Sequence, residues 1–77
     1  MNLTPNQQSV LFALTTEWQT PIQITDRLQK ANADLSNVNH LIKNLMYEGL
    51  VQANPVILGM YRLTSKGTAT RAVLLGE

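Results

Sequence analysis

The first part of the chain carries apolar side chains at a spacing that predicts an α-helix. Four apolar residues fall on one face at 3.6 residues per turn: Val10, Leu11, Leu14 and Trp18. A Thr-Pro-x-Gln sequence at residues 4–7 precedes them. Its hydroxyl can accept from the first free amides and its glutamine can reach back, as is typical of a helix start. We therefore expect a first helix over residues 5–17.

The same Thr-Pro-x-Gln start recurs at residues 20–23 and predicts a second helix over residues 21–31. Ile24 and Leu28 then point inward, together with Ala31. A short polar connection follows, after which Asp34 is a suitable cap for a third helix over residues 35–48. Gly49 is placed to end this third helix.

The third predicted helix divides into an apolar and a polar arc. Six apolar residues gather within about 140° of arc: Leu35, Val38, Leu41, Ile42, Leu45 and Met46. The opposite arc holds five residues: Ser36, His40, Lys43, Asn44 and Tyr47. Asn37 and Asn39 lie on its two flanks. This division predicts a helix that packs on a core and presents a polar face to water.

The sequence pattern changes at residues 50–64, which predict two short strands joined by a loop that contains Pro55. In the C-terminal segment, residues 65–77, Thr64 can cap a last short helix, which Gly67 weakens. The expected fold class is mainly α with a small β-hairpin, and the whole chain, residues 1–77, is expected to form one domain.

Composition agrees with one small globular domain, because 44% of the 77 residues are hydrophobic and only 14% are charged. A chain this short buries little surface, so its stability should be marginal. The absence of Cys excludes disulfides and thiolate metal ligands. The longest apolar run, residues 10–14, is far too short to cross a bilayer. We expect a soluble, cytoplasmic protein with no membrane contact.

Catalysis and cofactor binding have little support in the sequence. His40 is the one histidine, and without Cys nearby it cannot make a metal site. No Ser or Thr stands in a recognisable arrangement with His40 and a carboxylate, and the four Gly are scattered singly instead of forming a phosphate loop. We expect no enzyme, no metal site and no small-molecule cofactor.

Three segments carry a resemblance to a known family: residues 22–28, 37–51 and 61–67. They include Leu-x-x-x-Gly-Leu-Val, beginning at Leu45, and Tyr-x-Leu-Thr-x-x-Gly, beginning at Tyr61. Over most of residues 5–70 the chain resembles winged-helix transcriptional regulators, of the multiple-antibiotic-resistance repressor and penicillinase repressor types. The resemblance implies a winged helix-turn-helix whose third helix enters the major groove of double-stranded DNA. It also implies that the second helix crosses the backbone and that the hairpin wing touches phosphate or the minor groove.

Carried over to this chain, the resemblance places the base contacts on the third helix: Ser36, Asn37, His40, Lys43, Asn39 and Asn44. Phosphate contacts fall to Arg27, Lys30 and Arg62. An Asn amide matches adenine N6 and N7, and Lys suits guanine O6 and N7. The alternative is that these groups only solvate an exposed helix face, and that Arg27 and Lys30 compensate the helix dipole. Phe12 and Trp18 are assigned to packing and not to base stacking.

Two functions remain open at this point. The preferred one is a sequence-specific DNA-binding regulator that acts as a homodimer on a twofold-symmetric site. The other is a winged helix that binds protein alone, through Val56, Ile57 and Leu58 of the wing loop. A net charge of only +1 favours it, as does a loop that carries apolar side chains instead of Arg or Lys.

Overall fold

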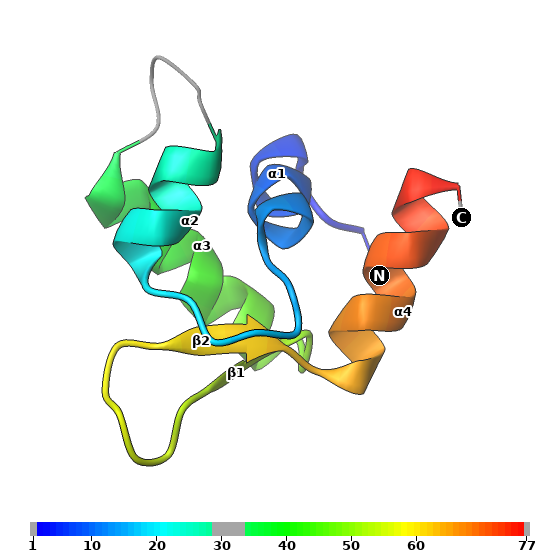
Figure 1. Ribbon diagram of the computed structural model, residues 1–77. Helices are drawn as coiled ribbons and strands as arrows, with labels where there is room; N and C mark the ends of the chain where they lie inside the picture. Colours follow the sequence, from blue (N-terminus) through cyan, green and yellow to red (C-terminus); the bar gives the residue numbers. More distant parts are fainter. Residues whose placement is uncertain (1, 29–33, 77) are drawn as a thin grey trace.

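Figure 1 shows the computed structural model, which describes residues 2–28 and 34–76. Three helices are followed by a hairpin and a fourth helix, the order that the sequence predicts. The helices are α1 (Pro5–Ala13), α2 (Pro21–Leu28), α3 (Leu35–Tyr47) and α4 (Ser65–Leu75), and the strands are β1 (Val51–Ala53) and β2 (Tyr61–Leu63).

Side chains cap all four helices at the residues expected from the sequence. Thr4 accepts from the Gln7 amide at 3.2 Å while the Gln7 side chain accepts from the Thr4 amide. Thr20 and Gln23 repeat this reciprocal pair. The remaining two caps are Asp34, which accepts from the Asn37 amide at 2.7 Å, and Thr64, which accepts from the Gly67 amide at 2.9 Å. Each helix start therefore has an amide satisfied locally.

Helix α1 is shorter than predicted and ends at Ala13 instead of residue 17. The chain then runs extended beside β2. The Leu63 amide donates to the Thr15 carbonyl at 2.9 Å, and Gln19 and Tyr61 exchange two backbone hydrogen bonds of 2.8 Å. These bonds join residues more than 40 positions apart, so the helical periodicity gave no sign of them. Residues 15–19 therefore meet the edge of β2 at Thr15 and Gln19 without forming a regular strand.

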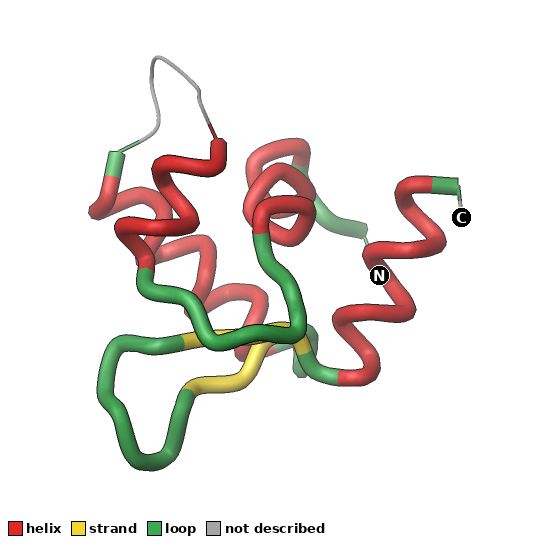
Figure 2. Tube along the Cα trace, viewed as in Figure 1, coloured by secondary structure: helices red, strands yellow, loops and turns green. Residues whose placement is uncertain are grey.

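The hairpin is antiparallel, with Val51 opposite Leu63, Gln52 opposite Arg62 and Ala53 opposite Tyr61. Its loop projects well away from the helices (Figure 2). The Asn54 carboxamide oxygen accepts from the Val56 and Ile57 amides at 2.8 and 2.9 Å, and the Asn54 amide donates to the Met60 carbonyl. The loop is therefore a built turn, held by its own hydrogen bonds.

The core is formed where α1, α2 and α3 meet the inner face of the hairpin. Its buried residues are Val10, Leu11, Ala13, Leu14, Ile24, Val38, Leu41, Ile42, Leu45, Leu50, Val51 and Leu63. Leu35, predicted to face inward, is 43% exposed in the first turn of α3. Phe12 and Trp18, which the sequence assigned to packing, are only half-buried and do not belong to this core.

Helix α4 approaches the end of α3 closely, and Gly67 makes this approach feasible. A Cβ atom at Gly67 would lie only 1.9 Å from the Leu50 carbonyl oxygen. Thr64 donates from its amide to that same oxygen at 3.0 Å and from its hydroxyl to the Gly49 carbonyl at 2.7 Å. Gly67 thus lowers the helix propensity of α4 but allows its backbone to lie close to the backbone of Leu50.

Candidate nucleic-acid interface

The outer face of α3 carries the residues that the sequence singled out for base contact. Ser36, Asn37, His40 and Lys43 are exposed, whereas Asn39 and Asn44 are half-buried. The opposite face of α3 is closed, because Val38, Leu41, Ile42 and Leu45 are buried in the core. The structure thus leaves the polar arc of α3 accessible to solvent.

Four of the exposed side chains form one stripe along α3. Ser36, His40, Lys43 and Tyr47 are spaced four, three and four residues apart, which places them on one side of a helix. Asn37 and Asn44 lie to one flank of the stripe and Asn39 to the other. Tyr47 is 92% exposed. Its phenol extends the stripe to the end of the helix, although the sequence reasoning gave it no role.

The charge of α3 is simple, because its sequence contains no carboxylate and Lys43 is its one charged residue. A helix face without acidic groups meets no repulsion from a phosphate backbone. The Asp34 carboxylate stands just before the helix and accepts from the Asn37 amide. This carboxylate is therefore engaged at the start of the helix, where the helix dipole favours an anion.

The residues predicted to contact phosphate do not form one cluster. Arg27 is exposed on α2, and Arg62 lies on β2, where its guanidinium carbon is 4.2 Å from the centroid of the Trp18 ring. A cation over the face of an indole is an attractive arrangement. Lys30, the third of these residues, falls outside the described ranges.

Trp18 lies on the outer side of the small sheet, opposite the core. Its neighbour Gln19 is 6% exposed and points inward, where its carboxamide oxygen accepts from the Thr15 amide and hydroxyl. Successive side chains of an extended segment point to opposite faces, so Trp18 turns outward to Arg62. This position could not be predicted while residues 14–17 were assigned to a helix.

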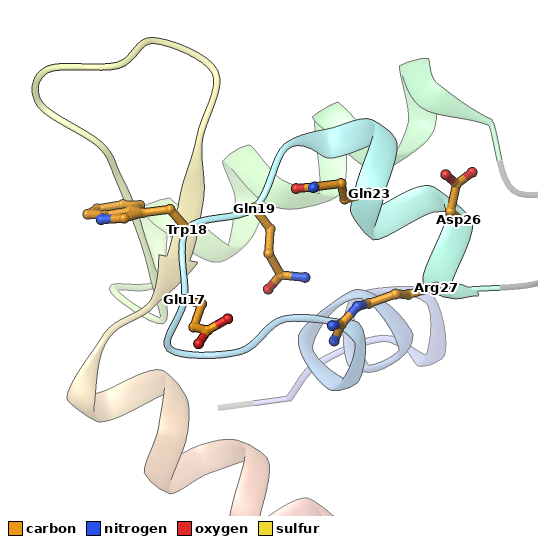
Figure 3. A pocket seen from close by; sticks show the side chains of 6 residues that line it. All are labelled: Glu17, Trp18, Gln19, Gln23, Asp26 and Arg27. Carbon is orange, nitrogen blue, oxygen red and sulfur yellow. The ribbon is translucent and has the colours of Figure 1, made fainter.

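A shallow hollow of about 330 Å³ lies between this segment and α2 (Figure 3). It is lined by Glu17, Trp18, Gln19, Gln23, Asp26 and Arg27. In Figure 3 the Glu17 and Arg27 side chains extend toward the same space, whereas the Trp18 ring points away to the wing. A lining that holds two carboxylates and one guanidinium does not favour an anion, so this hollow weakens the assignment of Arg27 to phosphate contact.

The wing loop exposes three consecutive apolar side chains. Val56, Ile57 and Leu58 are 85%, 55% and 92% exposed. No charged residue occurs between Val51 and Tyr61. The loop therefore offers apolar contact area and no ionic attraction to phosphate.

The described ranges contain neither a group of three His, Asp or Glu side chains placed to hold a metal ion nor a helix long and apolar enough to span a membrane.

Comparison with solved structures finds a match to a known repressor. A solved structure of the multiple antibiotic resistance repressor, MarR, superposes with a TM-score of 0.73 at 25% sequence identity. The match covers 99% of this chain and 59% of the repressor chain, so the chain spans a little over half of its length. No protein-family model and no curated protein matches by sequence. The structural match confirms the winged-helix fold that the sequence predicted, mainly helical with a two-stranded hairpin.

Proposed function

We propose that this chain is a sequence-specific double-stranded DNA-binding protein that regulates transcription and reads the major groove with α3. The observation that carries the proposal is the exposed stripe on α3 from Ser36 to Tyr47, which contains one cation and no carboxylate. The structural likeness to a protein named as a repressor supports a DNA-binding regulator at the level of the fold.

In this proposal the base contacts come from Ser36, Asn37, His40 and Lys43, with Asn39 and Asn44 at the edges of the contact. Asn37 is suited to adenine, because its amide offers a donor and an acceptor side by side. Lys43 is suited to guanine or to a phosphate oxygen. Arg62 supplies a phosphate contact from the wing, and Arg27 on α2 and Lys30 are two further candidates.

A homodimer follows from the small number of contacts that one α3 can make. A single recognition helix binds weakly, and two copies on half-sites about one helical turn apart combine their contacts. The net charge of +1 makes this argument stronger, since there is little general attraction to compensate for few specific contacts.

Selection from a pool of random duplexes tests the proposal. The purified protein should retain a set of related sequences, and the double variant N37A/K43A should lose that retention while keeping its far-UV circular dichroism. The matched control is N2A/N6A, which removes two exposed asparagine amides outside α3. Equal retention by the wild type and N37A/K43A would contradict DNA reading by α3.

A second candidate function rests on the exposure of Val56, Ile57 and Leu58. Under this alternative the chain is an adaptor or inhibitor that inserts the wing tip into an apolar pocket of a protein partner. I57D would then abolish partner capture and leave retention of DNA unchanged. The two functions are separated by which variant, N37A/K43A or I57D, removes binding.

A further inference from the structure

A second shallow hollow, of about 210 Å³, lies on the outer side of the hairpin beside the start of α4. It is lined by Thr16, Gln52, Arg62, Leu63, Thr64, Ser65 and Thr68. These residues come from the segment before α2, from both strands and from α4, so the folded chain is needed to bring them together. No carboxylate belongs to the lining, in contrast to the hollow beside Arg27.

The Arg62 guanidinium is held in position without its hydrogen-bonding capacity being used. It lies on the Trp18 ring at 4.2 Å, and within the described part of the chain it makes no hydrogen bond or ion pair. Stacking on an indole fixes the plane of a guanidinium and leaves its N–H donors free at the edge. A flat, immobilised fork of donors suits the oxygens of a phosphate group.

Other donors surround Arg62 and are also without partners. Gln52 stands directly opposite Arg62 in the strand register. The side chains of Gln52, Thr16, Ser65 and Thr68 form no hydrogen bond with any described residue. Hydroxyl and carboxamide groups can all donate to an anion. The hollow thus joins one cation and four neutral donors with no opposing negative charge.

We propose that this hollow binds a single phosphate group, with Arg62 as the charged ligand and the hydroxyls of Ser65 and Thr68 as neutral donors. Its volume is below the range typical of drug-sized sites. The proposal depends on the chemistry of this lining and not on base reading by α3. The phosphate group has two sources, a free or small-molecule phosphate and the backbone of duplex DNA.

Titration with inorganic phosphate tests the site in the 77-residue chain. In ¹⁵N-edited NMR at constant ionic strength, phosphate but not chloride should shift the amide signals of Arg62, Ser65 and Thr68 in a saturable manner. R62Q should weaken this binding about tenfold, the effect of losing a charge-assisted hydrogen bond.

Two further variants keep the test independent of the Trp18 stack. T68A removes a hydroxyl from an exposed helix position and should weaken phosphate binding severalfold while leaving the fold intact. R27Q removes an arginine that does not line this hollow and should leave the phosphate-dependent shifts of Ser65 and Thr68 unchanged. Absence of saturable shifts in the wild type, or equal loss in R62Q and R27Q, would overturn the proposal.

Duplex DNA identifies the source of the phosphate. If R62Q and T68A weaken both inorganic phosphate and duplex binding, the hollow takes a backbone phosphate. If they weaken inorganic phosphate alone, the hollow serves a free phosphate. Failure of N37A/K43A to alter DNA retention would overturn base reading by α3 and leave the phosphate titration unaffected, so the two proposals can fail separately.

Discussion

The Arg71 guanidinium of α4 donates two hydrogen bonds, of 3.0 and 3.4 Å, to the backbone carbonyl oxygen of Phe12 at the end of α1. The two residues are 59 positions apart. The final carbonyls of a helix have no partner within the helix. Arg71 satisfies one of them and ties the last helix of the chain to the first.

Replacing Arg71 should therefore loosen α4. We expect R71A to lower the free energy of unfolding by about 1–2 kcal/mol, the contribution typical of a hydrogen bond from a charged donor. Urea denaturation followed by circular dichroism measures the change. K43A, which removes an exposed cation, is the control and should have little effect. Equal stabilities of R71A and K43A would show that this tie does not hold α4 in place.

Gly67 should tolerate no larger residue. G67A places a Cβ atom against the Leu50 carbonyl oxygen, so α4 must move and the bonds from Thr64 to Leu50 and Gly49 must lengthen. We expect a loss of about 3 kcal/mol, as for an overpacked core, although Ala is the better helix former. The neighbouring T68A is the matched control, and its stability should be close to that of the wild type. A more stable G67A would contradict the close approach.

Gln19 should be the most sensitive polar residue of the core. Q19L removes the acceptor of the Thr15 amide and hydroxyl, and it should cost about 1–3 kcal/mol because buried donors lose their partner. Q19E also offers an acceptor oxygen, but it places a buried carboxylate where the Gln19 amide donates to the Ala13 carbonyl at 3.4 Å, so it should not recover the loss. Thermal unfolding compares the three proteins. A Q19L protein as stable as the wild type would mean that water replaces the carboxamide.

Asp34 should stabilise the first turn of α3. D34A removes the acceptor of the Asn37 amide and should lower stability by about 1 kcal/mol, the typical cost of losing a cap. Amide hydrogen exchange should accelerate at Ser36 and Asn37 and remain unchanged near Tyr47. D26A, an exposed aspartate on α2, is the control. If amide exchange is unchanged in D34A, packing alone stabilises this turn and the Asp34 cap does not.

Salt dependence separates the roles of Lys43 and Asn37 in the proposed DNA complex. If Lys43 contacts a phosphate, K43A should lower the magnitude of the slope of log K against log salt by about 0.9. N37A should weaken binding to the selected site by about 1–3 kcal/mol and leave the slope unchanged, because a base contact releases no counterion. Fluorescence anisotropy at several salt concentrations gives both quantities. A reduced slope in N37A instead would reverse this assignment.

The local part of the fold was predictable from the sequence. Four caps and the apolar arc of α3 depend on residues within a few positions of each other, and the structure confirms them for Thr4, Thr20, Asp34 and Thr64. Leu35 is the exception in that arc, since it lies in the first turn, where it remains 43% exposed.

The errors come from contacts between distant parts of the chain. Residues 14–18 continue the helical spacing of α1, yet pairing with β2 draws them into an extended segment and turns Trp18 away from the core. Gly67 was interpreted as a weak point of α4, because its contact with Leu50 is 17 positions distant in the sequence. For the candidate site, exposure of the α3 stripe follows from periodicity, whereas the stacking of Arg62 on Trp18 required the three-dimensional arrangement.

The pairing of residues 15–19 with β2 also affects how the protein behaves at high concentration. An unpaired strand edge exposes backbone donors and acceptors on which another molecule can add a strand and begin an aggregate. Here the segment before α2 occupies one edge of the hairpin, and β1, at the other edge, is only three residues long. A template this short is a poor seed for intermolecular sheet growth, so the irregular segment protects solubility as well as shape.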